Sequence, residues 1–108
     1  MQNKTAFHLQ LIMQLIDMEK FPLTKLLIEK NVSEQEYVDF MQLLQQINQD
    51  YQEQKDEGLL DFTSLLIQFV GMLNEKLSPN ETILALRQEG YYIDLMNEFI
   101  SLLNKHNL

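Results

Sequence analysis

The chain contains no cysteine. Disulfide bonds and thiolate metal sites are therefore excluded, and the fold must depend on a packed core. Valine, a strong strand former, occurs only at positions 32, 38 and 70, and no long segment alternates apolar with polar residues. Leucine, glutamine, glutamate and lysine dominate instead, and these residues favour helices. We therefore predict an all-α protein.

Long hydrophobic runs are also absent. The longest uncharged stretch covers residues 62–74, between Asp61 and Glu75. It is shorter than the roughly 20 apolar residues that a bilayer-spanning helix needs. The N-terminus is polar, and no apolar segment with a small-residue cleavage site follows it. We expect a cytoplasmic protein that forms one helical domain over residues 1–108, because a chain of this length can bury a sizeable core.

Basic residues are few. The chain has 8 basic and 16 acidic residues, a net charge of −8, and the acid is spread evenly over both halves. Nucleic acids and anionic membranes are bound mainly by lysine and arginine, so neither is an expected partner. The acidic charge is typical of a soluble surface, and it is also compatible with a regulator that binds a basic protein.

Apolar residues recur at helical spacing almost throughout the chain. Two stretches carry strong signals for the start of a helix. Ser33 and Glu36 form a capping box. In the segment Ser78-Pro79-Asn80-Glu81, the serine suits the N-cap position, the proline the first helical position and the glutamate the third. The pattern predicts an irregular array or bundle of about six helices, at residues 5–19, 22–30, 34–57, 62–76, 79–89 and 92–105.

No catalytic or metal-binding pattern survives inspection. Without cysteine, nucleophilic catalysis needs serine or threonine with a histidine base, and the only histidines are His8 and His106. The helical Glu-x-x-His metal motif is missing, and the acidic stretch 50–61 has Lys55 where a calcium loop needs glycine. The three glycines are too far apart to form a phosphate loop. We therefore expect no enzyme, no metal and no cofactor.

Two apolar features of the sequence need to be buried against other helices, of the same chain or of another. One is a seam on the long helix at coiled-coil spacing, formed by Tyr37, Phe40, Leu44, Ile47 and Tyr51. The other is the helix predicted at 62–76, which is apolar over much of its circumference and is therefore expected to be a mostly buried central helix. The seam is our candidate interface for a homo-oligomer, a dimer or a trimer. The alternative is a monomeric bundle that buries the apolar side of every helix within one chain.

Several segments resemble a known family. They are Asp17-Met18-Glu19-Lys20-Phe21-Pro22, Leu26-Leu27-Ile28-Glu29-Lys30, Leu73-Asn74-Glu75-Lys76-Leu77, Glu81-Thr82-Ile83-Leu84-Ala85-Leu86 and Leu95-Met96-Asn97-Glu98-Phe99-Ile100. Together they are similar to the YhaI-like family of small uncharacterised proteins from spore-forming Gram-positive bacteria. The resemblance implies a helical cytosolic domain of unknown function, and it carries over no catalytic or binding residue.

These observations favour a non-catalytic, self-associating protein-interaction module that can also bind another protein. Two alternatives stay open. One is an acidic regulatory protein that binds a basic protein partner. The other is a small-ligand sensor with an apolar groove between helices, which methionine residues would make adaptable.

Overall fold

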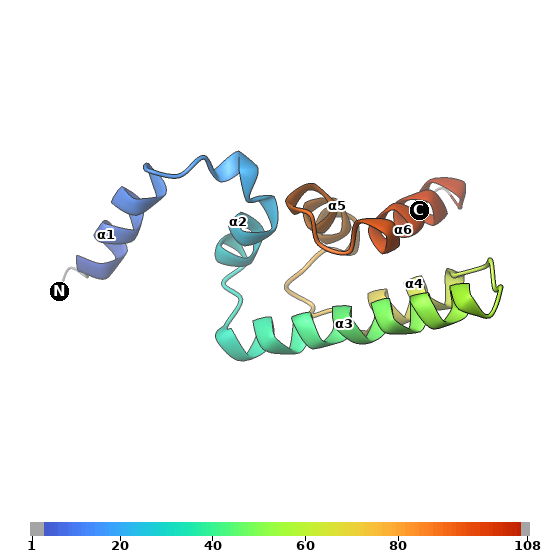
Figure 1. Ribbon diagram of the computed structural model, residues 1–108. Coiled ribbons are helices and arrows are strands. Elements are labelled where there is room, and N and C mark those ends of the chain that lie inside the picture. Colours follow the sequence, from blue (N-terminus) through green and yellow to red (C-terminus); the bar gives the residue numbers. More distant parts are fainter. Residues whose placement is uncertain (1–3, 107–108) are drawn as a thin grey trace.

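The computed structural model describes residues 4–106, and within that range it contains helices and no strand, so the predicted all-α class is confirmed. The described residues form six α-helices and one short 3-10 helix, and Figure 1 labels the α-helices. In chain order they are α1 (Lys4–Met13), η1 (Met18–Lys20), α2 (Pro22–Glu29), α3 (Glu34–Asp56), α4 (Thr63–Met72), α5 (Pro79–Glu89) and α6 (Ile93–Lys105).

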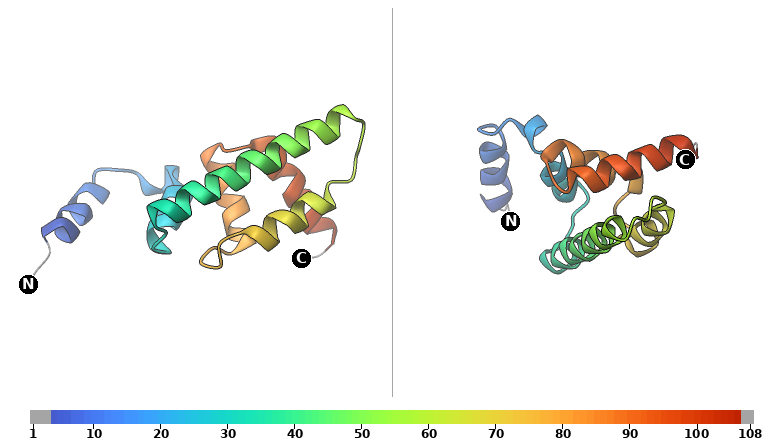
Figure 2. Two further views of the ribbon diagram at one scale, coloured as in Figure 1. Left: turned by 90° about the horizontal axis from the view of Figure 1, so that it is seen from below. Right: turned by 45° about the vertical axis from the view of Figure 1, so that its right-hand side comes forward.

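Five of the helices pack around one core. The long helix α3 and the shorter α4 form a helical hairpin, and α5 and α6 lie across it as a second layer, with α2 packed against α5 (Figures 1 and 2). We call this part, residues 22–106, the body. The first helix, α1, stands away from it, and the molecule measures 57 × 25 × 25 Å along its principal axes.

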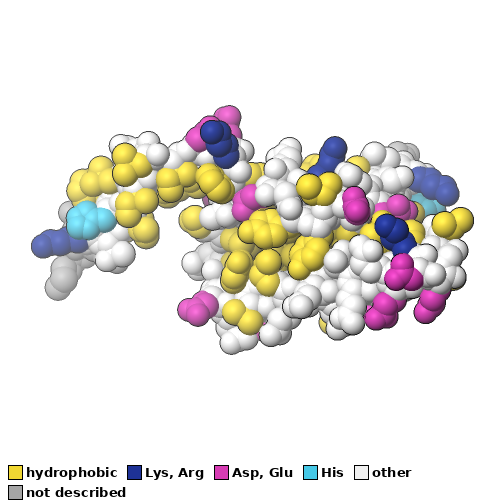
Figure 3. Space-filling model, in the orientation of Figure 1, with side chains coloured by type: hydrophobic (Ala, Val, Ile, Leu, Met, Phe, Trp, Pro, Cys, Tyr) yellow, Lys and Arg dark blue, Asp and Glu magenta, His cyan; other side chains and the backbone are white. Residues whose placement is uncertain are grey.

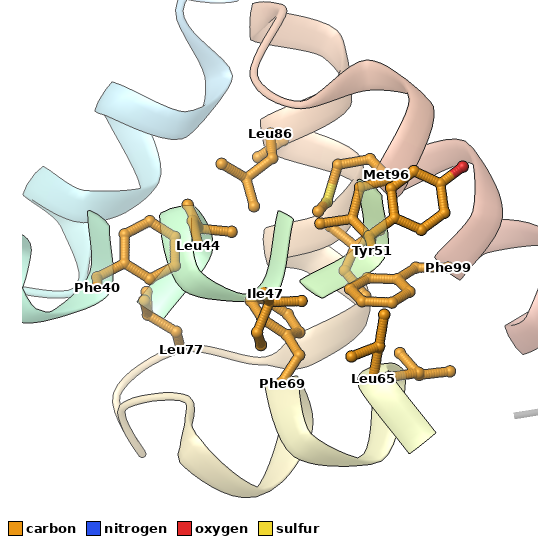
Figure 4. Packing of buried hydrophobic residues seen from close by; sticks show 14 of the residues in the cluster. Phe40, Leu44, Ile47, Tyr51, Leu65, Phe69, Leu77, Leu86, Met96 and Phe99 are labelled. Atoms are coloured by element: carbon orange, nitrogen blue, oxygen red, sulfur yellow. The ribbon is translucent and has the colours of Figure 1, made fainter. Parts of the chain in front are cut away.

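The core lies between the two layers. The rings of Phe69 of α4 and Phe99 of α6 pack at a tilt of 35° with centroids 5.6 Å apart, and both side chains are fully buried. Tyr51 of α3 meets Phe62 edge-on at 4.8 Å, in the geometry that aromatic quadrupoles favour. Figure 4 shows α3 contributing a row of side chains along this core, from Phe40 to Tyr51. The seam of the long helix is therefore what holds the two layers together.

The predicted capping box at the start of α3 is present, and it does more than cap the helix. Ser33 Oγ accepts from the Glu36 amide, and Glu36 Oε1 accepts from the Ser33 amide. The Glu36 carboxylate also accepts from Lys76 Nζ at 2.6 Å and from Asn74 Nδ2 at 2.8 Å. These hydrogen bonds, led by the one from Lys76, lower the pKa of Glu36 from its ordinary 4.5 to about 2. One carboxylate thus ties the start of α3 to the segment between α4 and α5.

Helix α4 is shorter and more exposed than its sequence predicts. It ends at Met72, four residues before the expected end, where Leu73 turns to an extended conformation. The Asn74 side chain then accepts from the Lys76 amide while donating to Glu36, so a tertiary contact ends the helix. Leu65, Leu66 and Phe69 are buried, but the opposite side is exposed, with Ile67 at 68% and Met72 at 62%. The helix lies on the surface and buries one side only.

The N-terminal helix also ends early. The pattern predicts helix over residues 5–19, but α1 ends at Met13 and a separate 3-10 turn follows at Met18–Lys20. No residue of α1 is buried, so no other helix among residues 4–106 covers it. A helix on its own must depend on intrinsic propensity, which is weak in so short a segment.

Candidate interaction surface

The segment before α2 is almost wholly exposed. We call residues 4–21, which contain α1, the linking residues and η1, the arm. No residue of α1 is buried, and every residue from 4 to 17 is exposed. Eight large apolar side chains of the arm are between 37% and 85% exposed, and they are Phe7, Leu9, Leu11, Ile12, Met13, Leu15, Ile16 and Phe21. Isolated exposed apolar residues are ordinary, but a contiguous group of this size indicates an interaction surface.

The arm and α2 enclose a groove, which we call the arm groove. Its volume is about 880 Å³, and Figure 3 shows the hollow that the arm leaves beside the body, with hydrophobic side chains along the arm. The lining is mostly apolar and comprises Leu9, Ile12, Met13, Leu15, Ile16, Asp17, Met18, Lys20, Phe21, Thr24 and Ile28. Such a lining offers few polar groups that would pair with a charged molecule.

The helix α1 is apolar on two opposite sides. Leu9, Ile12 and Met13 face the arm groove, at the i, i+3, i+4 spacing of one helix face. Phe7 and Leu11 lie on the other side, since two residues advance an α-helix by about 200°. Both of these side chains are also about half exposed. A helix that is apolar on two sides is normally buried on two sides.

Charge is divided unequally between the two parts of the molecule. Lys4 and Lys20 balance Asp17 and Glu19, so the arm is neutral and the whole net charge of −8 falls on the body. Between Lys4 and Asp17 the arm carries no lysine, arginine, aspartate or glutamate. Two bodies therefore repel each other, whereas two arms do not.

The N-terminus of α2, where the arm joins the body, is held by one carboxylate. The N-terminus of α2 has no cap of its own, since Phe21 occupies the N-cap position without a side-chain hydrogen bond. Glu89, at the end of α5, supplies the acceptor instead. Its Oε1 accepts from the amides of Leu23 and Thr24 at 3.0 and 3.1 Å, and its Oε2 accepts from Thr24 Oγ1 at 3.0 Å. Carboxylates at a helix N-terminus are stabilised by the helix dipole, so this contact anchors α2 beside the arm groove.

The structure places the five residues of the candidate interface in two different environments. Phe40, Leu44, Ile47 and Tyr51 are at most 5% exposed and pack inside a single chain. In this conformation they are occupied by the chain's own α4, α5 and α6, and so they are not available to a partner. Tyr37 is the exception, at 40% exposed. It lines a shallower groove of about 340 Å³ between α2 and α3 that shares Thr24 and Ile28 with the arm groove.

The histidines are not brought together. His8 lies on α1 and His106 caps the end of α6, at opposite ends of the molecule in Figures 1 and 2. Within residues 4–106 no group of three or more histidine, aspartate or glutamate side chains is arranged to hold a metal ion. Nor does any helix in that range have the length and apolar character needed to cross a membrane.

From the sequence, the candidate interface lies on the long helix, and the arm is not singled out. The apolar residues of α1 occur on two opposite sides, one with Leu9 and Ile12 and the other with Phe7 and Leu11, so the sequence of this helix has no single core-facing side. Apolar periodicity shows that a helix needs cover, but it does not show which chain supplies the cover.

The chain matches a protein-family model over almost its whole length. Residues 2–104 fit a family model described as "Protein of unknown function (DUF1878)". The match includes α1 and the groove residues as well as the body, so the arm is part of the family's domain rather than an addition to it. The implication that the chain is a domain of unknown function is confirmed, while the YhaI-like name and the spore-forming source stay predictions.

Proposed function

We propose that this chain, which belongs to the DUF1878 family of proteins of unknown function, is a non-catalytic protein-interaction module that associates with itself through the arm. The observation that carries the proposal is the absence of any buried residue in α1, a helix rich in large apolar side chains. The narrower YhaI-like assignment and the cytoplasmic location belong to the same proposal and are supported by the resemblance of the sequence.

The total surface supports the need for a partner. The chain exposes 7631 Å², whereas a folded monomeric protein of 12.8 kDa is expected to expose about 6,300 Å². The excess of about 1,300 Å² is larger than the roughly 800 Å² that each partner contributes to an interface of standard size. The radius of gyration, 16.2 Å, likewise exceeds the roughly 13 Å expected for a compact chain of this length.

The energy available from the arm is sufficient for association. Fully burying one large apolar side chain contributes about 1.5–3 kcal/mol, so burying the exposed half of eight such side chains contributes about 6–12 kcal/mol per arm. Losing free translation and rotation costs about 4–15 kcal/mol for the complex as a whole. Two arms that are buried together contribute about 12–24 kcal/mol, which exceeds this cost over most of its range.

The test is the absolute mass in solution, measured by light scattering over a concentration series. We expect the wild-type chain to have at least twice the 12.8 kDa mass of one protomer. Leu9→Asp places a charge in the arm groove and should give the monomer mass. Gln10→Asp, on the same helix turn between the two apolar sides, adds the same charge outside the groove lining and should leave the mass unchanged. A wild-type chain that is monomeric at every concentration contradicts the proposal.

The salt dependence of binding distinguishes self-association through the arm from the function of an acidic regulator. Binding of a basic protein to the −8 body weakens as salt screens the attraction. Association through neutral arms should strengthen, because salt screens the repulsion between two acidic bodies. Light scattering at low and high ionic strength therefore gives opposite trends for the two functions.

A small-ligand sensor is the second candidate, favoured by the volume of the arm groove. About 880 Å³ lies within the roughly 300–1,000 Å³ range of small-molecule sites. An apolar ligand that fills the groove should raise the unfolding temperature in proportion to the logarithm of its concentration. Leu9→Asp should abolish that shift, and Gln10→Asp should not.

A further inference from the structure

We infer that the arm groove is completed by α1 of a second copy of this chain, inserted between α1 and α2 of the first. This inference rests on the proposed function and specifies its geometry. The groove has one wall on α1, at Leu9, Ile12 and Met13, and a second wall on α2, at Thr24 and Ile28. A helix placed between these walls meets apolar surface on two sides.

The helix α1 has the form that such a position requires. One side carries Leu9 and Ile12, and the opposite side carries Phe7 and Leu11, about 200° further round. In the inserted position, the first side packs against the same side of the host's α1, and the second side packs against the host's α2. A helix with a single apolar face would leave one wall of the groove uncovered.

The charge of the groove lining also favours α1 of a second copy as the occupant. The groove lining contains one acidic and one basic side chain, Asp17 and Lys20, and is otherwise uncharged. It therefore offers no net charge to attract a basic or an acidic segment. The chain's own α1 is apolar and carries no lysine, arginine or acid after Lys4, and it is present at the same concentration as the groove.

A two-fold arrangement fills both grooves at once. Each α1 then lies in the groove of the other chain and also forms one wall of the groove that holds the other chain's α1. Both chains thus use the same surface, as an isologous contact requires. The arms lie at one end of the 57 Å long axis, so pairing at the arms places the two acidic bodies at opposite ends of the complex. The contact is thereby made where repulsion between the bodies is weakest.

The absence of natural cysteine allows the geometry to be tested by disulfide formation. Leu11→Cys and Ile28→Cys are prepared as separate proteins, mixed and mildly oxidised. Because each chain has one thiol, a mixed disulfide joins two copies, and it forms only where the Cα atoms approach to about 4.4–6.8 Å. Gln10→Cys mixed with Ile28→Cys is the matched control, since Gln10 points between the two apolar sides.

We expect the Leu11–Ile28 mixture to give a mixed disulfide of twice the 12.8 kDa chain mass, and Ile12→Cys alone to give a symmetric disulfide across the two-fold axis. The Gln10 control should give neither above the level reached in denaturant. A wild-type oligomer in which the Leu11–Ile28 pair links no faster than the control overturns the inserted geometry but leaves self-association standing. A monomeric wild-type chain overturns both.

Discussion

Replacing the buried Thr82 with valine should stabilise the body. Thr82 lies on α5 with no exposed surface, and its hydroxyl Oγ1 has no hydrogen-bond partner among the described residues. A buried polar group without a partner costs about 1–3 kcal/mol. Valine keeps the branched shape and removes the hydroxyl, so Thr82→Val should raise the free energy of unfolding by about 1–3 kcal/mol.

Thr24→Val is the matched control, because it makes the same chemical change where the hydroxyl is used. Thr24 Oγ1 donates to Glu89 Oε2 at 3.0 Å, so its loss should lower the free energy of unfolding by about 0.5–1.5 kcal/mol. Urea unfolding followed by far-ultraviolet circular dichroism, at one fixed protein concentration, measures both. A Thr82→Val protein that is less stable than wild type would refute the reasoning. The hydroxyl would then be bonded, most simply to the Ser78 carbonyl one helical turn earlier.

Two further predictions concern the ends of helices. Glu36 has a folded-state pKa of about 2 against an ordinary 4.5, so its contribution to stability should be complete above about pH 4.5 and should be lost as the pH falls toward 2. Urea titrations at several pH values should show that Glu36→Gln removes this part of the acid dependence; an unchanged pH profile would contradict it. Gly71 and Gly90 both have open space where a Cβ would lie, but Gly71 is helical and Gly90 has φ +95°. Gly71→Ala should therefore stabilise by up to about 1 kcal/mol, and Gly90→Ala should destabilise by about 1–2 kcal/mol. If thermal unfolding shows that both substitutions shift the unfolding temperature in the same direction, this interpretation is wrong.

Local signals predicted the body well. The capping box at Ser33 and Glu36 placed the start of α3, and the spacing of its apolar residues predicted the stripe that is buried in the core. Proline and glycine placed the limits of α5, from Pro79 to the left-handed Gly90 that follows Glu89. These features depend on residues within one or two turns of each other, so the sequence contains them directly.

The structure differs from the sequence-based expectation where a helix end depends on a residue that is distant in the chain. The end of α4 depends on Asn74 reaching Glu36, which is 38 positions away in the chain, and the N-terminus of α2 depends on Glu89, 66 positions from Leu23. Neither pairing can be deduced from the local pattern. Which chain covers the seam could not be predicted for a related reason, because periodicity does not distinguish burial against the same chain from burial against another copy.

The separation of a neutral apolar arm from an acidic body makes the molecule resemble a surfactant, with a short tail and a large charged head group. In surfactants the attraction of tails drives assembly, while repulsion between head groups limits how many can gather. Each chain that joins a cluster of arms brings another −8 of charge to its periphery, so electrostatic repulsion grows with every chain added. The charge of the body would then help to hold the assembly at the two chains that fill both arm grooves.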